Sequence, residues 1–366
     1  MSIQTNEYAP QSISHPGLSL AEKLEEMGMG VKEFSVRVNK PEKTIIAVTK
    51  GKSSITPDMA VKFEDVLNIP ASFWLKRQHR YDEYMARVKK EESILQAIDW
   101  VKKFPYAKMA SMGWVPATRK AKEKAANLFN FFKVSDHHAW ESYYYNQELK
   151  VSFRISLAHT NEAMAVAAWL RQGELQAEKL SVPDYDAGKL KKSLSHIKSI
   201  MASHPENFFQ ELCEVCKDAG VKVVYTPCLP KAPIHGCTRW IGDTPLIQLS
   251  ARYNANDKFW FTLFHEIGHI LLHGKKYISI ENINYSDQDI EKEEEADRFA
   301  VEHTFSEKEE EEVLNSIPLN PDKLRFFAKK FNTHPAMIIG RFHHKRLVPY
   351  SIGREFIEPV NLHNNS

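Results

Sequence analysis

The sequence holds little that would tie it to a membrane or to the cell exterior. Only four of its 366 residues are cysteines, and they do not form the disulfide framework of a secreted domain. No basic segment followed by an apolar one opens the chain, so no signal peptide is expected. The longest alanine-rich apolar run, residues 163–170, is far too short to span a bilayer. We therefore expect a cytoplasmic protein without a membrane partner.

Charge of one sign is also scarce, because the formal net charge is only +2. Such a balance does not predict a polyanionic partner for the chain as a whole. The apolar and charged fractions, 43% and 26%, are those of ordinary globular proteins, and the length allows two or three domains. Cys213 and Cys216 form a CxxC within an amphipathic helical pattern. Two further close ligands are not evident, so both are expected to be buried free thiols.

Five helical patterns follow a polar arm of eighteen residues. They cover residues 19–29, 31–38, 41–50, 56–67 and 71–90, and Ser19 with Glu22 has the spacing of a capping box. A short turn at Asn39 and Lys40 separates the second pattern from the third. A compact set of short helices with such a turn predicts a helix-turn-helix domain.

The rest of the chain changes character once. Residues 93–180 are helical in pattern and rich in aromatic side chains, and SVPDYDAG at 181–188 has the composition of a linker. Beyond it, VKVVYTP and TPLIQLS predict strands around a turn region, and four further helices follow. We predict a multi-domain protein: an arm (1–18), an all-α helix-turn-helix domain (19–92), a helical connecting region (93–180) and an α+β domain (181–366).

The segment FTLFHEIGHILLHG, residues 261–274, contains the pattern HExxH. His265 and His269 are four residues apart, so on a helix both imidazoles can reach one metal ion. Glu266 points about 100° away, where it can reach a water on the metal rather than the metal itself. The flanking apolar residues predict a buried helix, in which these polar groups are costly without a partner. Gly268 suggests that another backbone packs closely there.

The third zinc ligand must come from elsewhere. His273 lies about 12 Å along the helix axis from His265, too far for bonds of about 2 Å to one ion. Gly274 then marks the helix end, where His273 would interact with the last carbonyl groups. The acidic helix EKEEEADRFA offers Glu293 on its buried face, with Asp297 one turn later to orient a histidine. Glu295 is a fallback, and an ordinary acidic surface helix is the alternative; EKEEEE at 307–312 predicts a solvated helix face.

These motifs resemble two known families. HEIGHILLHG followed by ExxADxFA is similar to the ImmA/IrrE zinc metallopeptidases. SHPG, PEKTI, GKSSITP and IPASFW, within residues 14–85, resemble HigA-type antitoxins of the XRE helix-turn-helix family. The resemblance implies a gluzincin-like fold with two histidines and a downstream glutamate on Zn²⁺, in agreement with His265, His269 and Glu293. It also implies cleavage of a protein substrate such as a repressor or a toxin–antitoxin partner, and by analogy a homodimer.

The mechanism expected from this pattern is peptide hydrolysis with Glu266 as general base. The strand TPLIQLS next to the site helix is a candidate for holding the substrate as an added strand. His334 and Arg341, in THPAMIIGRF, are candidate oxyanion stabilisers, although structural roles are the simpler interpretation for both. The helix FAVEHTF is more polar than usual for the family.

Duplex DNA is a second expected partner. Residues 31–52 carry a local charge of +4, six basic minus two acidic residues, which suits phosphate contact. The candidate DNA-binding residues are Lys40, Lys43, Thr44, Lys50 and Lys52. The helix itself reads TIIAVTK, however, and Ile46 and Ala47 offer no hydrogen bonds to bases. The alternative is a retained helix-turn-helix fold that docks a protein through an apolar patch.

Three functions therefore stay open. The first is an antitoxin-like transcriptional regulator with a zinc endopeptidase domain. The second is a non-catalytic toxin- or partner-binding protein that uses both folds for docking. The third is a general peptidase whose N-terminal domain recruits substrate. The intact Glu266 favours an enzyme, because a binding module needs no base.

Overall fold

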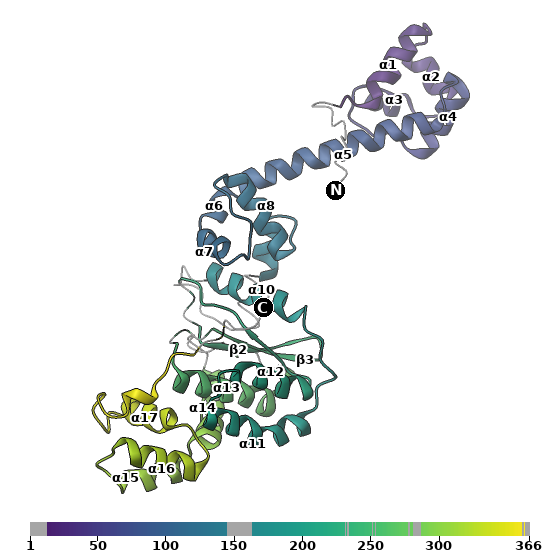
Figure 1. Ribbon diagram of the computed structural model, residues 1–366. Coiled ribbons are helices and arrows are strands. Elements are labelled where there is room, and N and C mark those ends of the chain that lie inside the picture. Colours follow the sequence, from purple (N-terminus) through teal and green to yellow (C-terminus); the bar gives the residue numbers. More distant parts are fainter. Residues whose placement is uncertain are drawn as a thin grey trace, which may run out of the picture. The chain divides into compact units, whose positions relative to one another are not determined.

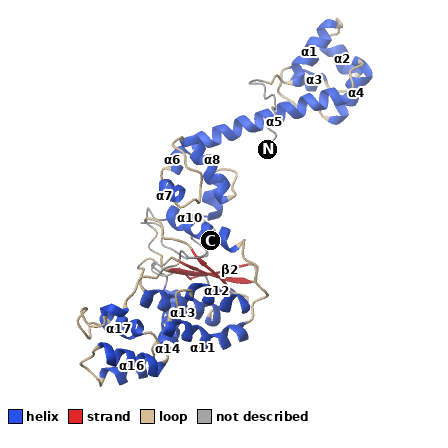
Figure 2. Ribbon diagram, viewed as in Figure 1, coloured by secondary structure: helices blue, strands red, loops and turns tan. Residues whose placement is uncertain are grey.

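The computed structural model describes residues 13–144, 163–230, 232, 234–250, 252, 254–276, 279–280, 287–360 and 362 (Figures 1 and 2). The chain forms two compact units, Met1–Gln96 and Ala97–Ser366. In the described part of the chain, no helix has both the length and the apolar character needed to cross a membrane.

The first unit consists of helices around one apolar core. They are α1 (Pro16–Glu26), α2 (Val31–Arg37), α3 (Glu42–Thr49), α4 (Pro57–Leu67) and α5 (Ala71–Gln96). The side chains fully buried where these helices meet include Leu20, Phe34, Ile45, Phe63 and Trp74. Each of the five predicted helices is present, and Asn39 turns the chain between α2 and α3 with a left-handed φ of 48°.

The start of α1 differs from the expectation. The His15 side chain accepts a hydrogen bond from the Gly17 backbone N–H at 2.9 Å, so His15 caps the helix and Pro16 takes its first position. The predicted capping box at Ser19 is therefore wrong. Proline suits the first helical position because its missing N–H would be unpaired there anyway. As a result α1 begins inside the range 1–18 that the sequence assigned to the arm.

Gly17 marks a close approach between two backbones. A Cβ atom at this position would lie 1.8 Å from the carbonyl oxygen of Val48, so only glycine lets α1 reach α3 this closely. Val48 belongs to the core of the unit. The contact therefore fixes the second helix of the helix-turn-helix pair against the scaffold.

The second unit opens with four short helices that share an aromatic core. These are α6 (Ile98–Val101), α7 (Tyr106–Ser111), α8 (Ala121–Phe132) and α9 (His137–Trp140). The rings of Trp100, Phe104, Phe132 and Trp140 pack with centroids 4.7 to 5.7 Å apart, mostly edge to face. The high aromatic content of this region thus serves packing.

A four-stranded mixed sheet forms the centre of the second unit. Its order is β1-β3-β2-β4, with β1 (Lys222–Tyr225) parallel to β3 (Thr244–Leu249), and β2 (Gly236–Ile241) antiparallel to both β3 and β4 (Ser279–Ile280). The sequence predicted β1 and β3 but treated β2 as part of a turn region. Because β3 pairs on both sides, the expectation that it holds substrate as an added strand is wrong.

Helices cover both faces of this sheet (Figures 1 and 2). Side chains alternate along a strand, so Leu246 and Val224 pack beneath α10 (Ala163–Ala177), whereas Ile247 and Leu249 join the larger core on the other face. That larger core includes residues of α11 (Ala187–Ser203), α12 (Phe208–Asp218) and α13 (Asn256–Leu272).

Polar contacts hold α10 on the sheet. The Trp169 indole N–H donates to the Thr226 carbonyl at 2.8 Å, and the Gln248 amide donates to the Trp169 carbonyl at 2.7 Å. The expected connecting region and linker therefore lie within the second unit from residue 97 onward. Asp186 within the expected linker caps α11 through the Gly188 and Lys189 backbone N–H groups. Both CxxC cysteines are free thiols as predicted, with Cys216 buried and Cys213 partly buried.

The chain closes with α14 (Asp287–Thr304), α15 (Glu307–Leu314), α16 (Pro321–Phe331) and α17 (Pro335–His344). The run at 307–312 is not wholly solvated as expected. Glu310 is 5% exposed and pairs with Lys345 at 2.6 Å and Arg341 at 3.4 Å. One acidic residue of this run therefore anchors α15 to α17.

We predict that Gly17→Ala destabilises the first unit by about 1–3 kcal/mol, because the new methyl group forces α1 away from α3. Hydrogen exchange over residues 16–50 of the full chain measures the change. Gly30→Ala is the matched control, since nothing lies within 4 Å of a Cβ atom there. Equal protection in both variants would contradict the contact.

Candidate metal centre

Helix α13 is mostly apolar and buried, and a few of its buried residues are polar. His265, Glu266 and His269 are 2%, 0% and 1% exposed. A helix that is apolar around most of its circumference must be buried, and this one packs between the sheet and α14. A Cβ atom on Gly268 would lie 3.2 Å from the ring of Phe299. The close neighbour expected at Gly268 is thus a side chain of α14 rather than a backbone.

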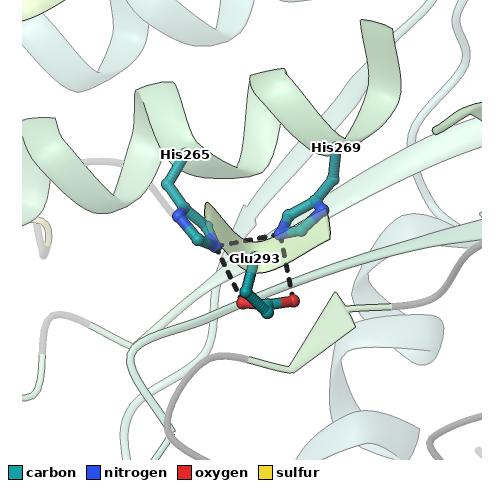
Figure 3. Close-up of side chains that lie close together, drawn as sticks. All are labelled: His265, His269 and Glu293. Carbon is teal, nitrogen blue, oxygen red and sulfur yellow. Dashed lines mark hydrogen bonds and ion pairs between the residues drawn. The ribbon is translucent and has the colours of Figure 1, made fainter. Parts of the chain in front are cut away.

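Three side chains from α13 and α14 converge on one point (Figure 3). The Nε2 atoms of His265 and His269 are 2.9 Å apart, and they lie 3.3 and 3.4 Å from the two carboxylate oxygens of Glu293. Each residue offers one ligand atom, and these atoms lie within 4.8 Å of one another. The structure therefore brings together the three residues that the sequence proposed as a set.

The outer ring nitrogens of both histidines also have partners. His265 Nδ1 lies 2.8 Å from Asp297 Oδ1, as expected for a carboxylate that orients a ligand histidine. His269 Nδ1 lies 3.0 Å from His273 Nδ1, and His273 Nε2 lies 2.9 Å from Glu295 Oε2. The sequence did not anticipate this second pair, because it placed His273 at the helix end and Glu295 on another side of α14.

Burial and neighbouring side chains together set the ionisation of His269 and Glu293. It lowers the pKa of His269 to about 4, so the imidazole is neutral near pH 7. Burial by itself raises the pKa of Glu293, but the interactions of its carboxylate with His265 and His269 outweigh burial and hold that pKa well below its usual range. Neutral imidazole and ionised carboxylate are the states in which these groups bind metal ions.

Glu266 lies against the first residue of β2. A Cβ atom on Gly236 would be 2.5 Å from Glu266 Oε1 and 2.7 Å from the Thr262 methyl group. The hydroxyl of Thr238, also in β2, donates to the Glu266 carbonyl at 3.1 Å. Glycine at position 236 therefore leaves room for the carboxylate between helix and sheet. The sequence did not single out Gly236, since β2 itself was missed.

His334 and Arg341 have partners outside the cluster. His334 caps α17 by accepting from the Ala336 N–H at 3.2 Å, and its ring faces His204. Arg341 donates to the Phe305 carbonyl and pairs with Glu310. Their recorded contacts fit the structural roles that the sequence offered as the simpler interpretation.

Comparisons with known proteins found similarity to a metallopeptidase-like family and to a curated protein. A family model described as the IrrE N-terminal-like domain, Peptidase M78, matches residues 216–337, which include the three clustered side chains. Virulence-associated protein A of Dichelobacter nodosus is 35% identical over 69 residues, which are 18% of this chain and 68% of that protein. The chain joins a helix-turn-helix module that resembles the HigA type in sequence to an ImmA/IrrE-family domain.

Some solved structures that are similar to part of the chain are described as antidote or antitoxin proteins. One is an addiction module antidote protein of a HigA family from Coxiella burnetii, which is 31% identical, covers 23% of this chain and 91% of its own, and has a TM-score of 0.22. Another is antitoxin HigA of Pseudomonas aeruginosa, solved with the higBA promoter, with 23% identity, 23% and 91% coverage and a TM-score of 0.22.

In the HigA-type module, the candidate DNA-binding residues differ in their surroundings. Lys43, Lys50 and Lys52 are exposed, and Thr44 is half-buried on α3. Lys40 instead pairs with Asp58 at 2.6 Å. Among the residues that the structure describes, no carboxylate forms an ion pair with Lys43, Lys50 or Lys52. Ile46 is 37% exposed beside them.

A cavity of about 290 Å³ lies between the start of α13 and α17. Thr262 lines it and also neighbours the position where Gly236 meets Glu266. The other lining residues are His235, Asp257, Lys258, Phe261, Met337, Gly340, Arg341 and His344. Arg341 also lines this cavity, although its hydrogen bond and its ion pair go to Phe305 and Glu310.

We predict that the second unit loses stability as the pH falls from about 6.5 to about 4. Burial lowers the pKa of His334 to about 4, so in this window the unfolded chain binds a proton that the folded chain does not. His334→Asn keeps a capping side chain and removes on the order of 2 kcal/mol of the loss. Urea unfolding from pH 7.5 to 4.5 in a chelator measures this, and equal slopes for parent and variant would contradict it.

Proposed function

We propose that the ImmA/IrrE-family domain is a zinc-dependent endopeptidase. The observation that carries this proposal is the convergence of two buried imidazole nitrogens and one carboxylate oxygen of the half-buried Glu293. If both Nδ1 atoms carry the ring protons, lone pairs face one another at 2.9 Å. Such an arrangement is repulsive without a cation between the groups.

The donor set and its spacing fit zinc. Tetrahedral zinc with bonds of about 2.0–2.1 Å places neighbouring ligand atoms about 3.3 Å apart. The two Nε2 atoms are 2.9 Å apart and lie 3.3 and 3.4 Å from different oxygens of Glu293, and one ligand atom from each residue lies within 4.8 Å of the others. Two histidines and one glutamate leave a fourth position for water or substrate, as in catalytic zinc sites of the gluzincin type.

In this proposal, His265, His269 and Glu293 hold the ion and Asp297 orients His265. Zinc supplies Lewis acidity, which polarises a peptide carbonyl and makes water more acidic. Glu266 accepts a proton from the attacking water on its carboxylate and passes it to the leaving amine. Its burial between α13 and β2 keeps the carboxylate in one place. The products are a new carboxylate and a new amine.

The sheet and the cavity suggest how a peptide approaches. Within the described residues, β4 is the edge strand on the side of β2, and β2 begins at Gly236 beside Glu266. An extended peptide that pairs with this edge runs past the cluster. The cavity that starts at Thr262 then receives one of its side chains. A repressor or a toxin–antitoxin partner is the proposed protein substrate.

The alternative is a non-catalytic binding protein that uses the same fold to dock a partner. A docking surface requires neither a buried glutamate next to the metal ligands nor a glycine that makes room for it. Glu266 and Gly236 together thus favour hydrolysis. The expected homodimer stays a prediction.

For the HigA-type module we propose binding to duplex DNA. The exposed Lys43, Lys50 and Lys52 lie on or directly after α3, the second helix of the pair, which is the element that usually enters the major groove. Lys40 contributes less, because Asp58 already neutralises it. Protein docking through Ile46 and its neighbours is the rival interpretation. The fusion then acts as a regulator whose repression and proteolysis reside in one chain.

We predict one zinc ion per chain, with Glu293→Gln weakening zinc binding at least tenfold, since a ligand is lost. Glu266→Gln keeps the zinc but lowers the cleavage rate by about 10²–10⁴, since the base is lost. Metal analysis and cleavage of the repressor or antitoxin encoded beside the gene measure the two effects.

Glu294→Gln is the matched control on the same helix, because Glu294 is exposed and pairs with Arg298. Zinc content that Glu293→Gln leaves unchanged would refute the ligand assignment. A zinc-loaded parent that cuts no adjacent repressor at any rate would leave the binding interpretation.

For DNA, we predict that Lys43→Ala, Lys50→Ala and Lys52→Ala each weaken binding to the gene's own upstream region. Each change should reduce the slope of log affinity against log salt by about 1, because one phosphate contact is lost. Lys40→Ala should have a smaller effect. A gel-shift titration at several salt concentrations tests this, and no shift at low salt would favour protein docking.

A further inference from the structure

His273 occupies a place that the proposed metal site does not use. It lies next to His269 on the ring edge away from Glu293, with 3.0 Å between the two Nδ1 atoms. Its own Nε2 atom reaches Glu295 Oε2 at 2.9 Å. The His273 side chain is 4% exposed and that of Glu295 41% exposed. A buried chain of contacts thus runs from His269 toward the surface of α14.

The end of α13 explains how His273 reaches this position. Its backbone N–H donates to the His269 carbonyl at 3.1 Å, so the last turn of the helix is intact and residues i and i+4 stack. Gly274 follows with a φ of +63°, which ends the helix directly after His273. The side chain therefore packs along α13 against His269.

Each neutral imidazole carries one ring proton, and this fixes where the protons lie along the contacts from His269 to Glu295. When His269 uses Nε2 as a metal ligand, its ring proton is on Nδ1 and must be donated outward. His273 can accept it only with an unprotonated Nδ1, which places the ring proton of neutral His273 on Nε2. That proton points at the Glu295 carboxylate. A single hydrogen-bond direction, His269 to His273 to Glu295, satisfies all three groups.

We propose that His273 and Glu295 are positioning residues for the metal ligand His269. They fix its ring orientation and tautomer, as Asp297 does for His265, so each ligand histidine has its own carboxylate from α14. This inference rests on the proposed zinc site. It assigns His273 neither to the metal nor to a simple helix cap.

The test is zinc affinity, measured by competition with a chromophoric chelator at pH 7.5. We expect His273→Ala to weaken binding about 10- to 100-fold. His273→Asn should recover most of the loss, because its amide oxygen can accept the proton from His269. Glu295→Ala should weaken binding less than His273→Ala, and the visible spectrum of the Co²⁺ form should change in His273→Ala.

His303→Ala is the matched control. His303 is a partly buried histidine on α14 that stacks on Phe299 and contacts its carbonyl, outside the cluster. Unchanged zinc affinity in His273→Ala overturns this inference and leaves the peptidase proposal intact. A loss in His273→Ala that matches a fall in the unfolding midpoint of the metal-free protein, with no recovery in His273→Asn, also overturns it. A parent chain that binds no zinc refutes the metal site itself.

Discussion

The contact between α13 and α14 is the constraint on which the site depends. Each helix contributes an incomplete set: α13 carries two imidazoles, and α14 carries the carboxylate that meets them. Gly268 lets the Phe299 ring come close, so the helices approach near enough for Glu293 to touch both histidines. A larger residue at 268 would separate the helices and the three ligand atoms together.

The same helix pair also decides the outer contacts of the cluster. Asp297 and Glu295 both lie on α14, as Glu293 does. Asp297 contacts His265 directly, and Glu295 ends the series of contacts that runs from His269 through His273. Both carboxylates are partly solvated, whereas the imidazoles are buried. Each buried imidazole is thus connected through polar contacts to a carboxylate that reaches solvent, which limits the free-energy cost of burying the two histidines.

The sheet provides the surroundings of Glu266, the residue next to the metal-ligand candidate His265. Gly236 at the start of β2 leaves space for the Glu266 carboxylate, and the cavity beside Thr262 opens next to it. On the opposite face, α10 binds the sheet through Trp169 and Gln248. The helical segment before the domain is therefore part of its structure. In the HigA-type module, Gly17 has a comparable role, because only a residue without a side chain allows α1 to pack this closely against α3.

The sequence alone determined the elements with strong local patterns. The spacing of His265 and His269 on an apolar helix, the five N-terminal helices and the buried face of α14 all follow from periodicity, because a regular element repeats its exposure every few residues. Glu293 and Asp297 could be chosen for the same reason.

Tertiary structure decided whatever depends on partners distant in the chain. The strand β2 was missed because GCTRWI has little alternation and becomes a strand only between β3 and β4. Glu295 was only a fallback for the third ligand, and Glu310 was expected at the surface, until the structure placed His273 beside the first and Arg341 and Lys345 beside the second. The roles of Gly236 and Gly17 likewise depend on which atoms of other elements lie next to them. A linear sequence pattern does not show how close those atoms are.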